Sequence, residues 1–240
     1  MKNRLADSRE AGNNFRHELK YLCSDAQLVL IEGRIRRICA VDAHAGTSGI
    51  YRIRSLYFDD RTDRYLTENE NGCDPREKFR IRIYNADIGQ IKLECKRKEH
   101  GMTQKTSCAL TEEQCRAAMA GTMTLTGNEP AVLRKFYLEQ KRGLMPKVIV
   151  SYERKPFVYR IGNVRITFDR NLESSTRVED FLEKNVYAVP VLPVGQHILE
   201  VKYDALLPDY LREVMQIGSL QETAFSKYYM CRKNTTEEFV

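Results

Sequence analysis

The 240-residue sequence contains no tryptophan and no CxxC cysteine pair. It also lacks any apolar run of about 18 residues, so no segment is expected to span a membrane. The first 14 residues are polar and have no apolar stretch of the kind found in signal peptides. The seven cysteines are odd in number, which argues against a disulfide framework or a structural zinc site. We therefore expect a protein of a reduced, cytoplasmic compartment.

Motifs of several common enzyme classes are missing as well. The sequence has no P-loop, no GxGxxG motif and no HExxH motif, and its four histidines are scattered. The net charge of +6 comes from 39 Lys and Arg against 33 Asp and Glu. This excess is too small to identify a polyanionic partner by itself. The arrangement of the charges is therefore more informative than their sum.

Residue patterns predict an α+β fold made mostly of strands. Eight segments alternate in the manner of β-strands: 15–22, 50–58, 78–84, 91–98, 103–110, 147–154, 164–169 and 198–203. Helix signals predict a helix over 25–38 after Ser24, one from Thr111 to Gly121, one from Pro130 to Gly143, one from Pro208 to Gly218 and a short one over 62–70. No linker or repeat interrupts the chain, so we expect one domain over 1–240, with 1–14 flexible or loosely packed.

The charges lie on one face of the predicted strands. In 78–84, Lys78, Arg80 and Arg82 share a face while Phe79 and Ile81 point away. Seven such faces carry 13 cations: Arg16, Lys20, Arg52, Arg54, Lys78, Arg80, Arg82, Lys92, Lys96, Lys98, Arg154, Arg165 and Lys202. Only four acids accompany them: Glu18, Glu94, Asp169 and Glu200.

A solvent-exposed sheet face is one explanation of this pattern. Exposed faces usually mix both signs, however, and like charges on neighbouring strands repel unless something neutralises them. An eight-stranded antiparallel barrel encloses a space suited to one ligand. We therefore expect a barrel with a basic lumen that holds a chain of phosphates, with helices covering the apolar outer face.

Seven segments, in order and nearly over the whole chain, carry a family resemblance. They begin at Lys78 (KFRIRIY), Lys92 (KLECKRKEH), Met102 (MTQKTS), Ser151 (SYERKPF), Val164 (VRITFDRNL), Ile198 (ILEVKYD) and Phe225 (FSKYYMCR). Together they resemble the VTC domain of the vacuolar transporter chaperone polyphosphate polymerases. That domain belongs to the triphosphate tunnel metalloenzyme (CYTH-like) superfamily, whose fold is an eight-stranded antiparallel tunnel.

The resemblance implies that ATP and inorganic polyphosphate bind in the tunnel with Mn²⁺ or Mg²⁺. It implies catalytic roles for five cations: Arg80, Arg82, Lys96, Arg154 and Lys227. It implies further phosphate contacts from Lys20, Lys105, Tyr152, Arg165, Lys202 and Ser226. The metal would be held by Glu200 of the Leu-Glu-Val-Lys motif, with Glu18 and Glu94 as further candidates.

One departure from the superfamily bears on the reaction. Hydrolytic tunnel enzymes begin with Glu-x-Glu-x-Lys, whereas this strand reads Arg16-His-Glu18-Leu-Lys20. Losing the first carboxylate removes a metal ligand, which favours an ATP-dependent polyphosphate polymerase. A tunnel triphosphatase and a non-catalytic polyphosphate-binding subunit remain as alternatives.

Nucleic acid is not expected as a partner, because aromatic residues do not alternate with the cations as stacking platforms would. The eukaryotic polymerases also carry accessory and membrane domains for which this sequence shows no counterpart. The resemblance therefore implies no particular membrane partner.

Overall fold

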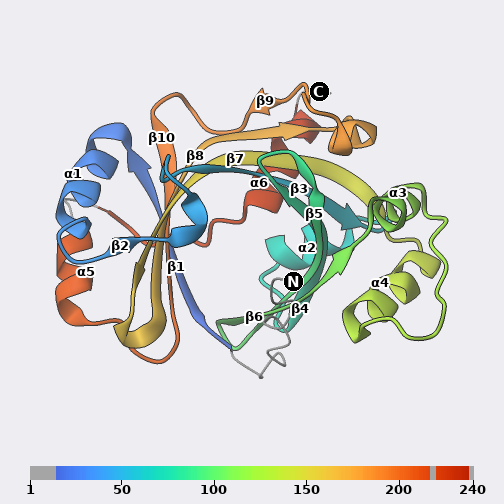
Figure 1. Cartoon of the computed structure of the whole chain (residues 1–240), viewed down its shortest axis with the longest axis horizontal. Helices are drawn as coiled ribbons and strands as arrows, with labels where there is room; N and C mark the ends of the chain where they lie inside the picture. Colours follow the sequence, from blue (N-terminus) through green and yellow to red (C-terminus); the bar gives the residue numbers. More distant parts are fainter. Residues whose placement is uncertain (1–14, 217–219, 238–240) are drawn as a thin grey trace, which may run out of the picture.

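The computed structural model describes residues 15–216 and 220–237, with side chains to residue 234, and contains one curled antiparallel sheet (Figure 1). Neighbouring strands follow the order β1-β10-β8-β7-β3-β4-β5-β6. The eight long strands are β1 His17–Ser24, β3 Tyr51–Asp59, β4 Arg76–Tyr84, β5 Asp87–Glu99, β6 Met102–Leu110, β7 Met145–Tyr159, β8 Val164–Ser175 and β10 Gln196–Tyr203. Two short strands extend the sheet, β2 Ala40–Val41 on β7 and β9 Val189–Pro190 on β8.

The sheet curls until its two edge strands meet. Arg16, just before β1, and Thr103 of β6 exchange both backbone hydrogen bonds at 2.9 Å. This single bridge joins the edges, so the strands surround a central space. The predicted α+β fold with eight antiparallel strands is therefore confirmed, each predicted strand having a counterpart. β7 and β8 run five and six residues beyond the predicted ends at Arg154 and Asp169.

Six α-helices belong to the described part of the chain. They are α1 Asp25–Ile35, α2 Arg64–Glu70, α3 Glu112–Ala120, α4 Ala131–Lys141, α5 Asp209–Met215 and α6 Lys227–Glu237. The capping boxes of Ser24 and Thr111 are both formed, and Gly121 ends α3 with φ 69°, in the left-handed region that suits glycine.

One helix boundary and one whole helix differ from the sequence prediction. α1 ends at Ile35, three residues before the predicted end at Ile38, which is 36% exposed. The predicted end of α5 at Gly218 and the N-terminal segment 1–14 fall outside the described residues. α6 was not predicted, because its apolar residues do not form one clear stripe.

Helices cover the convex face of the sheet in two groups. α1 and α5 bury Leu28, Ile31 and Leu211 against β7, β8 and β10. α3 and α4 cover the other half, where Phe136 of α4 packs edge-on against Phe58 and Phe79. Burying a side chain of this size contributes about 1.5–3 kcal/mol. Because the apolar residues of the strands point into these clusters, their polar neighbours face the concave side.

Strand β3 differs from the predicted orientation. Tyr51, Ile53 and Tyr57 face the concave side, whereas Arg52 and Arg54 point outward. Arg52 is exposed and pairs with Glu173, and Arg54 donates to backbone carbonyls that include that of Phe181 at 3.0 Å. The expectation that both arginines share the basic face is therefore wrong.

The helices of the described residues are all too short or too polar to cross a membrane.

Candidate functional site

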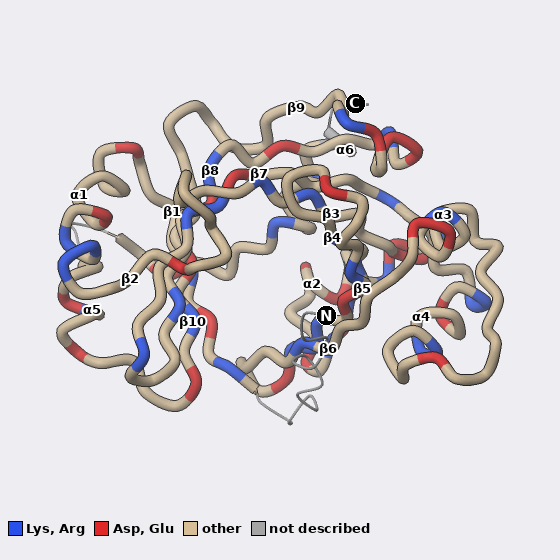
Figure 2. The backbone as a smooth tube through the Cα atoms, viewed as in Figure 1, with Lys and Arg blue, Asp and Glu red and all other residues tan. Residues whose placement is uncertain are grey.

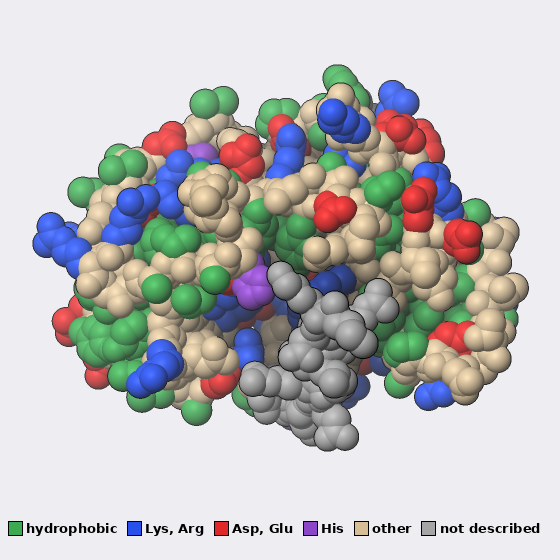
Figure 3. Space-filling view, in the orientation of Figure 1, with side chains coloured by type: hydrophobic (Ala, Val, Ile, Leu, Met, Phe, Trp, Pro, Cys, Tyr) green, Lys and Arg blue, Asp and Glu red, His purple; other side chains and the backbone are tan. Residues whose placement is uncertain are grey.

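The curled sheet surrounds a central hollow made of two adjoining cavities of about 400 and 420 Å³. Figure 2 shows Lys and Arg on the strands and on the start of α6 around the middle of the sheet, and Figure 3 shows cationic side chains at the hollow of this face. We call the space around Arg82 and Arg154 the first cavity, and the space around Arg76 and Lys98 the second cavity. Their shared lining consists of Glu18, Lys20, Lys78, Lys96, Thr103 and Ser226.

All the predicted phosphate-contacting side chains line the first cavity. They are Lys20, Arg80, Arg82, Lys96, Lys105, Tyr152, Arg154, Arg165, Lys202, Ser226 and Lys227. Ten of them come from seven strands and from α6, and Ser226 directly precedes α6. The curl of the sheet brings them together. The candidate metal ligands Glu18 and Glu200 line the same cavity. Their chemical roles stay predictions.

One cluster of charges is built on β4, β5 and β6 around Glu94. The Nε of Arg80 donates to Glu94 Oε2 at 2.7 Å, and Lys105 Nζ lies 2.9 Å from Oε1. The Nη1 of Arg82 is 3.6 Å from Oε2. Burial alone would raise the pKa of Glu94, but Arg82, Arg80 and Lys105 hold it well below its usual value. Glu94 is fully buried, lines neither cavity and fixes the positions of these cations.

A second cluster joins β7, β8, β10 and α6 around Arg154. Its guanidinium donates two hydrogen bonds to Asp169, both at 2.6 Å, and a third to Glu200 at 3.0 Å. Asp169 also pairs with Lys227 at 2.6 Å, and Glu200 with Lys202 at 3.3 Å. Burial would raise the pKa of Asp169, but Arg154 and Lys227 lower it strongly, so it stays ionised. Asp169 thus positions two of the predicted catalytic cations.

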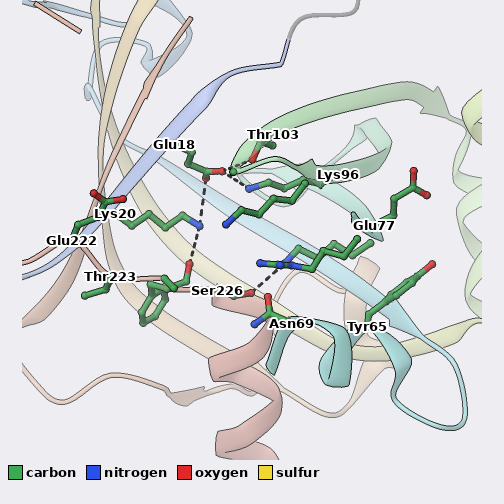
Figure 4. Close-up of a pocket in the computed structure, with 16 residues that line it drawn as sticks. Glu18, Lys20, Tyr65, Asn69, Glu77, Lys96, Thr103, Glu222, Thr223 and Ser226 are labelled. Carbon is green, nitrogen blue, oxygen red and sulfur yellow. Dashed lines mark hydrogen bonds and ion pairs between the residues drawn. The ribbon is translucent and has the colours of Figure 1, made fainter. Parts of the chain in front are cut away.

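The third cluster surrounds Glu18 of β1, where the two cavities meet (Figure 4). Three ammonium groups approach this carboxylate: Lys96 in a hydrogen-bonded pair, Lys20 at 3.5 Å and Lys202 at 3.7 Å. Burial alone would raise the pKa of Glu18, but these three lysines hold it well below its usual value. The carboxylate therefore keeps three cations close together before any anionic ligand binds.

Tyrosine hydroxyls orient three of the arginines, a role the sequence did not reveal. Tyr57 accepts from Arg80 at 2.7 Å, and Tyr51 accepts from Arg165 at 3.0 Å. Both tyrosines lie on the face of β3 opposite Arg52 and Arg54. The prediction followed these arginines and therefore assigned the wrong face of β3 to the lumen. Arg82 reaches the predicted Tyr152 at 3.4 Å. Burial alone would raise the pKa of Tyr152, but Arg154 and Arg82 lower it to about 8.

The chain before α6 closes one side of the hollow. Lys20 Nζ donates to the carbonyl of Phe225 at 2.8 Å, and Lys78 Nζ donates to the Oγ of Ser226 at 3.1 Å. The backbone of Thr223 donates to the carbonyl of Lys20 at 2.8 Å. The C-terminal segment is therefore tied to β1 and β4 through cations that also face the hollow. Sequence reasoning named Ser226 and Lys227 as site residues and placed Lys78 on the basic face, but it did not name Lys78 as a site residue.

The oxygen donors in the hollow suit one kind of metal site. The described residues contain no group of three His, Cys, Asp or Glu side chains able to hold a metal ion. Glu18 and Glu200 nevertheless both reach the ammonium of Lys202, so two carboxylates face one space. This donor set fits an ion bound by one or two carboxylates, with water and substrate phosphates as its other ligands. Glu94 is enclosed by cations and does not line either cavity.

Comparisons with known proteins agree with this architecture. The family model of the VTC domain matches residues 15–235. A candidate adenylyl cyclase from Hippeastrum with a dominant triphosphatase activity is 12% identical in sequence and superposes with a TM-score of 0.54. The match covers 92% of this chain and 96% of the Hippeastrum protein. A candidate adenylate cyclase from Bacillus halodurans is 15% identical in sequence, with a TM-score of 0.48. This match covers 84% of this chain and 87% of the Bacillus protein. No curated protein matches the sequence.

Proposed function

Because the chain belongs to the VTC domain family and has the triphosphate tunnel fold, we propose that it is a metal-dependent polyphosphate polymerase. It transfers the γ-phosphate of ATP to the end of a growing inorganic polyphosphate and releases ADP. The observation that carries this proposal is the central hollow, where cations from seven strands and α6 face one space. No nucleic acid is needed as a partner, and the seven free cysteines accord with a reduced, cytoplasmic compartment.

The proposed reaction needs positioning and charge more than acid–base chemistry. A terminal phosphate oxygen of the growing polyphosphate attacks the γ-phosphorus of ATP. The bond between that phosphorus and the β,γ-bridging oxygen then breaks. The attacking oxygen is already ionised, so no general base is required. Arg80, Arg82, Lys96, Arg154 and Lys227 stabilise the charge on the transferred group and on the leaving ADP.

The arginines suit this task because their planar donors engage two phosphate oxygens at once. Several are held in position before substrate binds, Arg154 by Asp169 and Arg80 by Glu94 and Tyr57. Lys20, Lys105, Arg165, Lys202, Tyr152 and Ser226 complete the proposed phosphate contacts. Charge-assisted hydrogen bonds of this kind contribute about 1.5–3 kcal/mol each.

A divalent ion, Mn²⁺ or Mg²⁺, belongs to the proposal. Glu200 would hold it, with Glu18, which approaches the same Lys202 ammonium, as a second carboxylate. Glu94 is left out because it is enclosed behind Arg80 and Arg82. When bound, the ion would neutralise negative charge on the phosphates.

Hydrolysis of triphosphate is the second candidate function. It is favoured by the carboxylates Glu18 and Glu200 on one side of the hollow and by the triphosphatase activity of the Hippeastrum protein. Arg16 counts against it, because it occupies the position of the first carboxylate of the hydrolytic motif. Arg16 pairs with Asp204 at 3.0 Å at the rim of the first cavity.

The test is to incubate the purified chain with ATP and Mn²⁺, resolve polyanions on a gel and measure ADP and orthophosphate. We expect ADP and a long polymer with little orthophosphate. Arg82→Ala should abolish the polymer, while Arg97→Ala, which removes a cation from the outer face of β5, should not. Orthophosphate without polymer would identify a triphosphatase, and binding of polyphosphate without any product would identify a binding subunit.

A further inference from the structure

A third cavity, of about 550 Å³, lies outside the central hollow on the convex side of β7. It shares no lining residue with the two cavities of the hollow. Its walls come from the turn after α1, from β2 and the loop that follows it, and from β7; α1 and β2 lie at the left of Figure 1. The lining residues are Arg36, Cys39, Val41, Gly46, Thr47, Ser48, Gly49, Lys155 and Phe157.

Three cations surround a single acid at this cavity. The Nε of Arg36 donates to Glu32 Oε1 at 2.7 Å, and Lys155 Nζ lies 2.5 Å from the same oxygen. Arg170 Nη2 lies 4.0 Å from Glu32 Oε2, and the buried Nε of Arg170 has no hydrogen-bond partner among the described residues. Within the same part of the chain, Glu32 is the only carboxylate that forms an ion pair with any of these cations. Three positive charges therefore face one negative charge.

The loop on another wall of the cavity carries free hydrogen-bond donors. It runs from Gly46 to Gly49 and follows the short helix η1 Ala43–Ala45. The amides of Gly46 and Gly49 donate to backbone carbonyls within this turn. Among the described residues, the amides of Thr47 and Ser48 and the hydroxyl of Thr47 have no hydrogen-bond partner. Both residues are exposed, so these donors are open to a ligand.

The shape of this loop is fixed by its own contacts. Gly46 has φ 59° and ψ −160°, a region that is essentially restricted to glycine. Asp42 caps η1 by accepting from the backbone of His44 at 3.0 Å, and the Oγ of Ser48 donates to the carbonyl of Ile50 at 2.8 Å. The free donors therefore hold their positions before a ligand binds, which lowers the entropic cost of binding.

The charge and the donors of the cavity suit a phosphomonoester. Such a group carries close to two negative charges at neutral pH and has three acceptor oxygens. The planar guanidinium of Arg36 and the ammonium of Lys155 can each contact one face of it, and successive free amides in a turn bind anions. Val41, Cys39 and Phe157 supply an apolar wall beside these groups. The cations form one compact group and not a row, so a long phosphate chain does not suit this cavity.

We propose that the third cavity binds a small organic phosphomonoester, with its phosphate between Arg36, Lys155 and the loop amides and its apolar part against Val41. Arg170 adds positive charge behind Glu32 without lining the cavity. The site is separate from the central hollow and does not depend on the proposed function.

Titration of the isotope-labelled chain with phenyl phosphate tests the site, because the amide resonances of Thr47 and Ser48 report on this cavity and not on the hollow. We expect these resonances to shift and saturate. The double variant R36Q/K155Q should lose roughly tenfold or more of the affinity measured there. The matched control R34Q/R37Q removes the same charge from the same end of α1, and since neither residue lines the cavity, its affinity should change less than about twofold.

Glu32→Gln provides a second variant whose expected effect has the opposite sign. It removes the carboxylate that competes with the ligand for Arg36 and Lys155, so phenyl phosphate should bind a few times more tightly. A melting curve of each variant verifies that it is folded. If R36Q/K155Q does not fold, an unchanged or weaker affinity in Glu32→Gln would by itself overturn the proposal.

Two further probes separate the parts of the ligand. Benzoate keeps the ring but has one charge, and inorganic phosphate keeps the charge but lacks the ring, so both should bind more weakly than phenyl phosphate. Benzoate as tight as phenyl phosphate would exclude a phosphate site, and inorganic phosphate as tight would exclude the apolar contact. Loop resonances that do not move, or equal losses in the two double variants, would overturn the proposal as a whole.

Discussion

At the scale of single residues, each of a few acids in the central hollow neutralises several cations. Glu94, Asp169, Glu200 and Glu18 each contact two or more cations from different strands or helices. Each acid therefore lowers repulsion among its neighbours and fixes their positions. The cations still outnumber the acids, and the phosphate chain of the proposed function would supply the charge that is missing.

Arg80 should contribute to both stability and binding. Arg80→Ala leaves the fully buried Glu94 with only Lys105 and the more distant Arg82, so we expect a loss of about 1–3 kcal/mol in the free energy of unfolding. Triphosphate affinity should fall roughly tenfold or more. Chemical denaturation and calorimetric titration measure the two effects. The double variant Arg80→Ala/Glu94→Gln should regain most of the stability, and a triphosphate affinity in it equal to that of Glu94→Gln alone would exclude Arg80 as a phosphate ligand.

A substitution at Glu200 distinguishes a role in metal binding from a role in ion pairing. Glu200→Gln keeps an acceptor oxygen for Arg154, which also retains its two bonds to Asp169, so the melting temperature should barely move. Removing a negative charge beside Lys202 should leave triphosphate affinity without metal equal or tighter. Turnover with Mn²⁺ should be abolished. A variant that melts well below the parent and still turns over ATP would identify Glu200 as a structural ion-pair partner.

At the scale of elements, α6 completes the site from outside the sheet. Its first residue, Lys227, pairs with Asp169 of β8, and Tyr228 donates a hydrogen bond to the fully buried Asp59 of β3. Asp59 also accepts from the backbone of Tyr65 at the start of α2. One buried carboxylate therefore holds α2 and α6 on β3, and the position of Lys227 depends on it.

Tyr228→Phe tests this link. The change leaves the aromatic packing against Tyr57 but removes the hydroxyl from Asp59, so we expect a loss of about 1–3 kcal/mol in unfolding free energy and faster amide exchange in α6. Tyr229→Phe is the matched control, because the Tyr229 hydroxyl contacts the exposed side chains of Glu70 and Lys233 and no buried carboxylate. It should cost less than about 0.5 kcal/mol. Equal effects of the two changes would mean that Asp59 does not anchor α6.

At the scale of the whole molecule, collecting cations in one hollow makes both stability and binding depend on pH. Burial, with Lys20 and Arg80 nearby, lowers the pKa of Lys78 to about 7. Burial likewise lowers the pKa values of Lys20 and Lys202 to about 8. In the unfolded chain these lysines have their ordinary, higher pKa values. Above pH 7 these lysines therefore bind more protons in the unfolded state than in the folded one.

We expect the ligand-free protein to become more stable as pH rises from 7 to 8.5, because stability rises with pH wherever the unfolded state binds more protons. Polyphosphate affinity should fall over the same range, since the anion prefers the charged lysines. Melting curves and titrations across this range measure both trends. In Lys78→Arg the side chain stays charged, so both trends should weaken. A stability that falls from pH 7 to 8.5, or an affinity that does not fall, would contradict the lowered lysine pKa values.

The sequence by itself determined the strands, the capped helices and the family of the fold. Alternation along a strand and a capping box act between near neighbours, so 78–84 and Thr111 with Gln114 could be interpreted without a structure. The family motifs identified the side chains that line the first cavity. Strand alternation and capping boxes are local features. The family motifs are specific because seven segments occur in the same order as in the family.

Only the tertiary structure decided which face of each strand is enclosed and which charges meet. Arg52 and Arg54 alternate as Arg80 and Arg82 do, yet they point outward, because the pairing of β3 with its neighbours turns Tyr51 toward the hollow. The roles of Asp169 and Lys78, and the placing of α6, depend on contacts between residues far apart in the chain. Such contacts follow from how the sheet curls, and the period of a single strand carries no information about that.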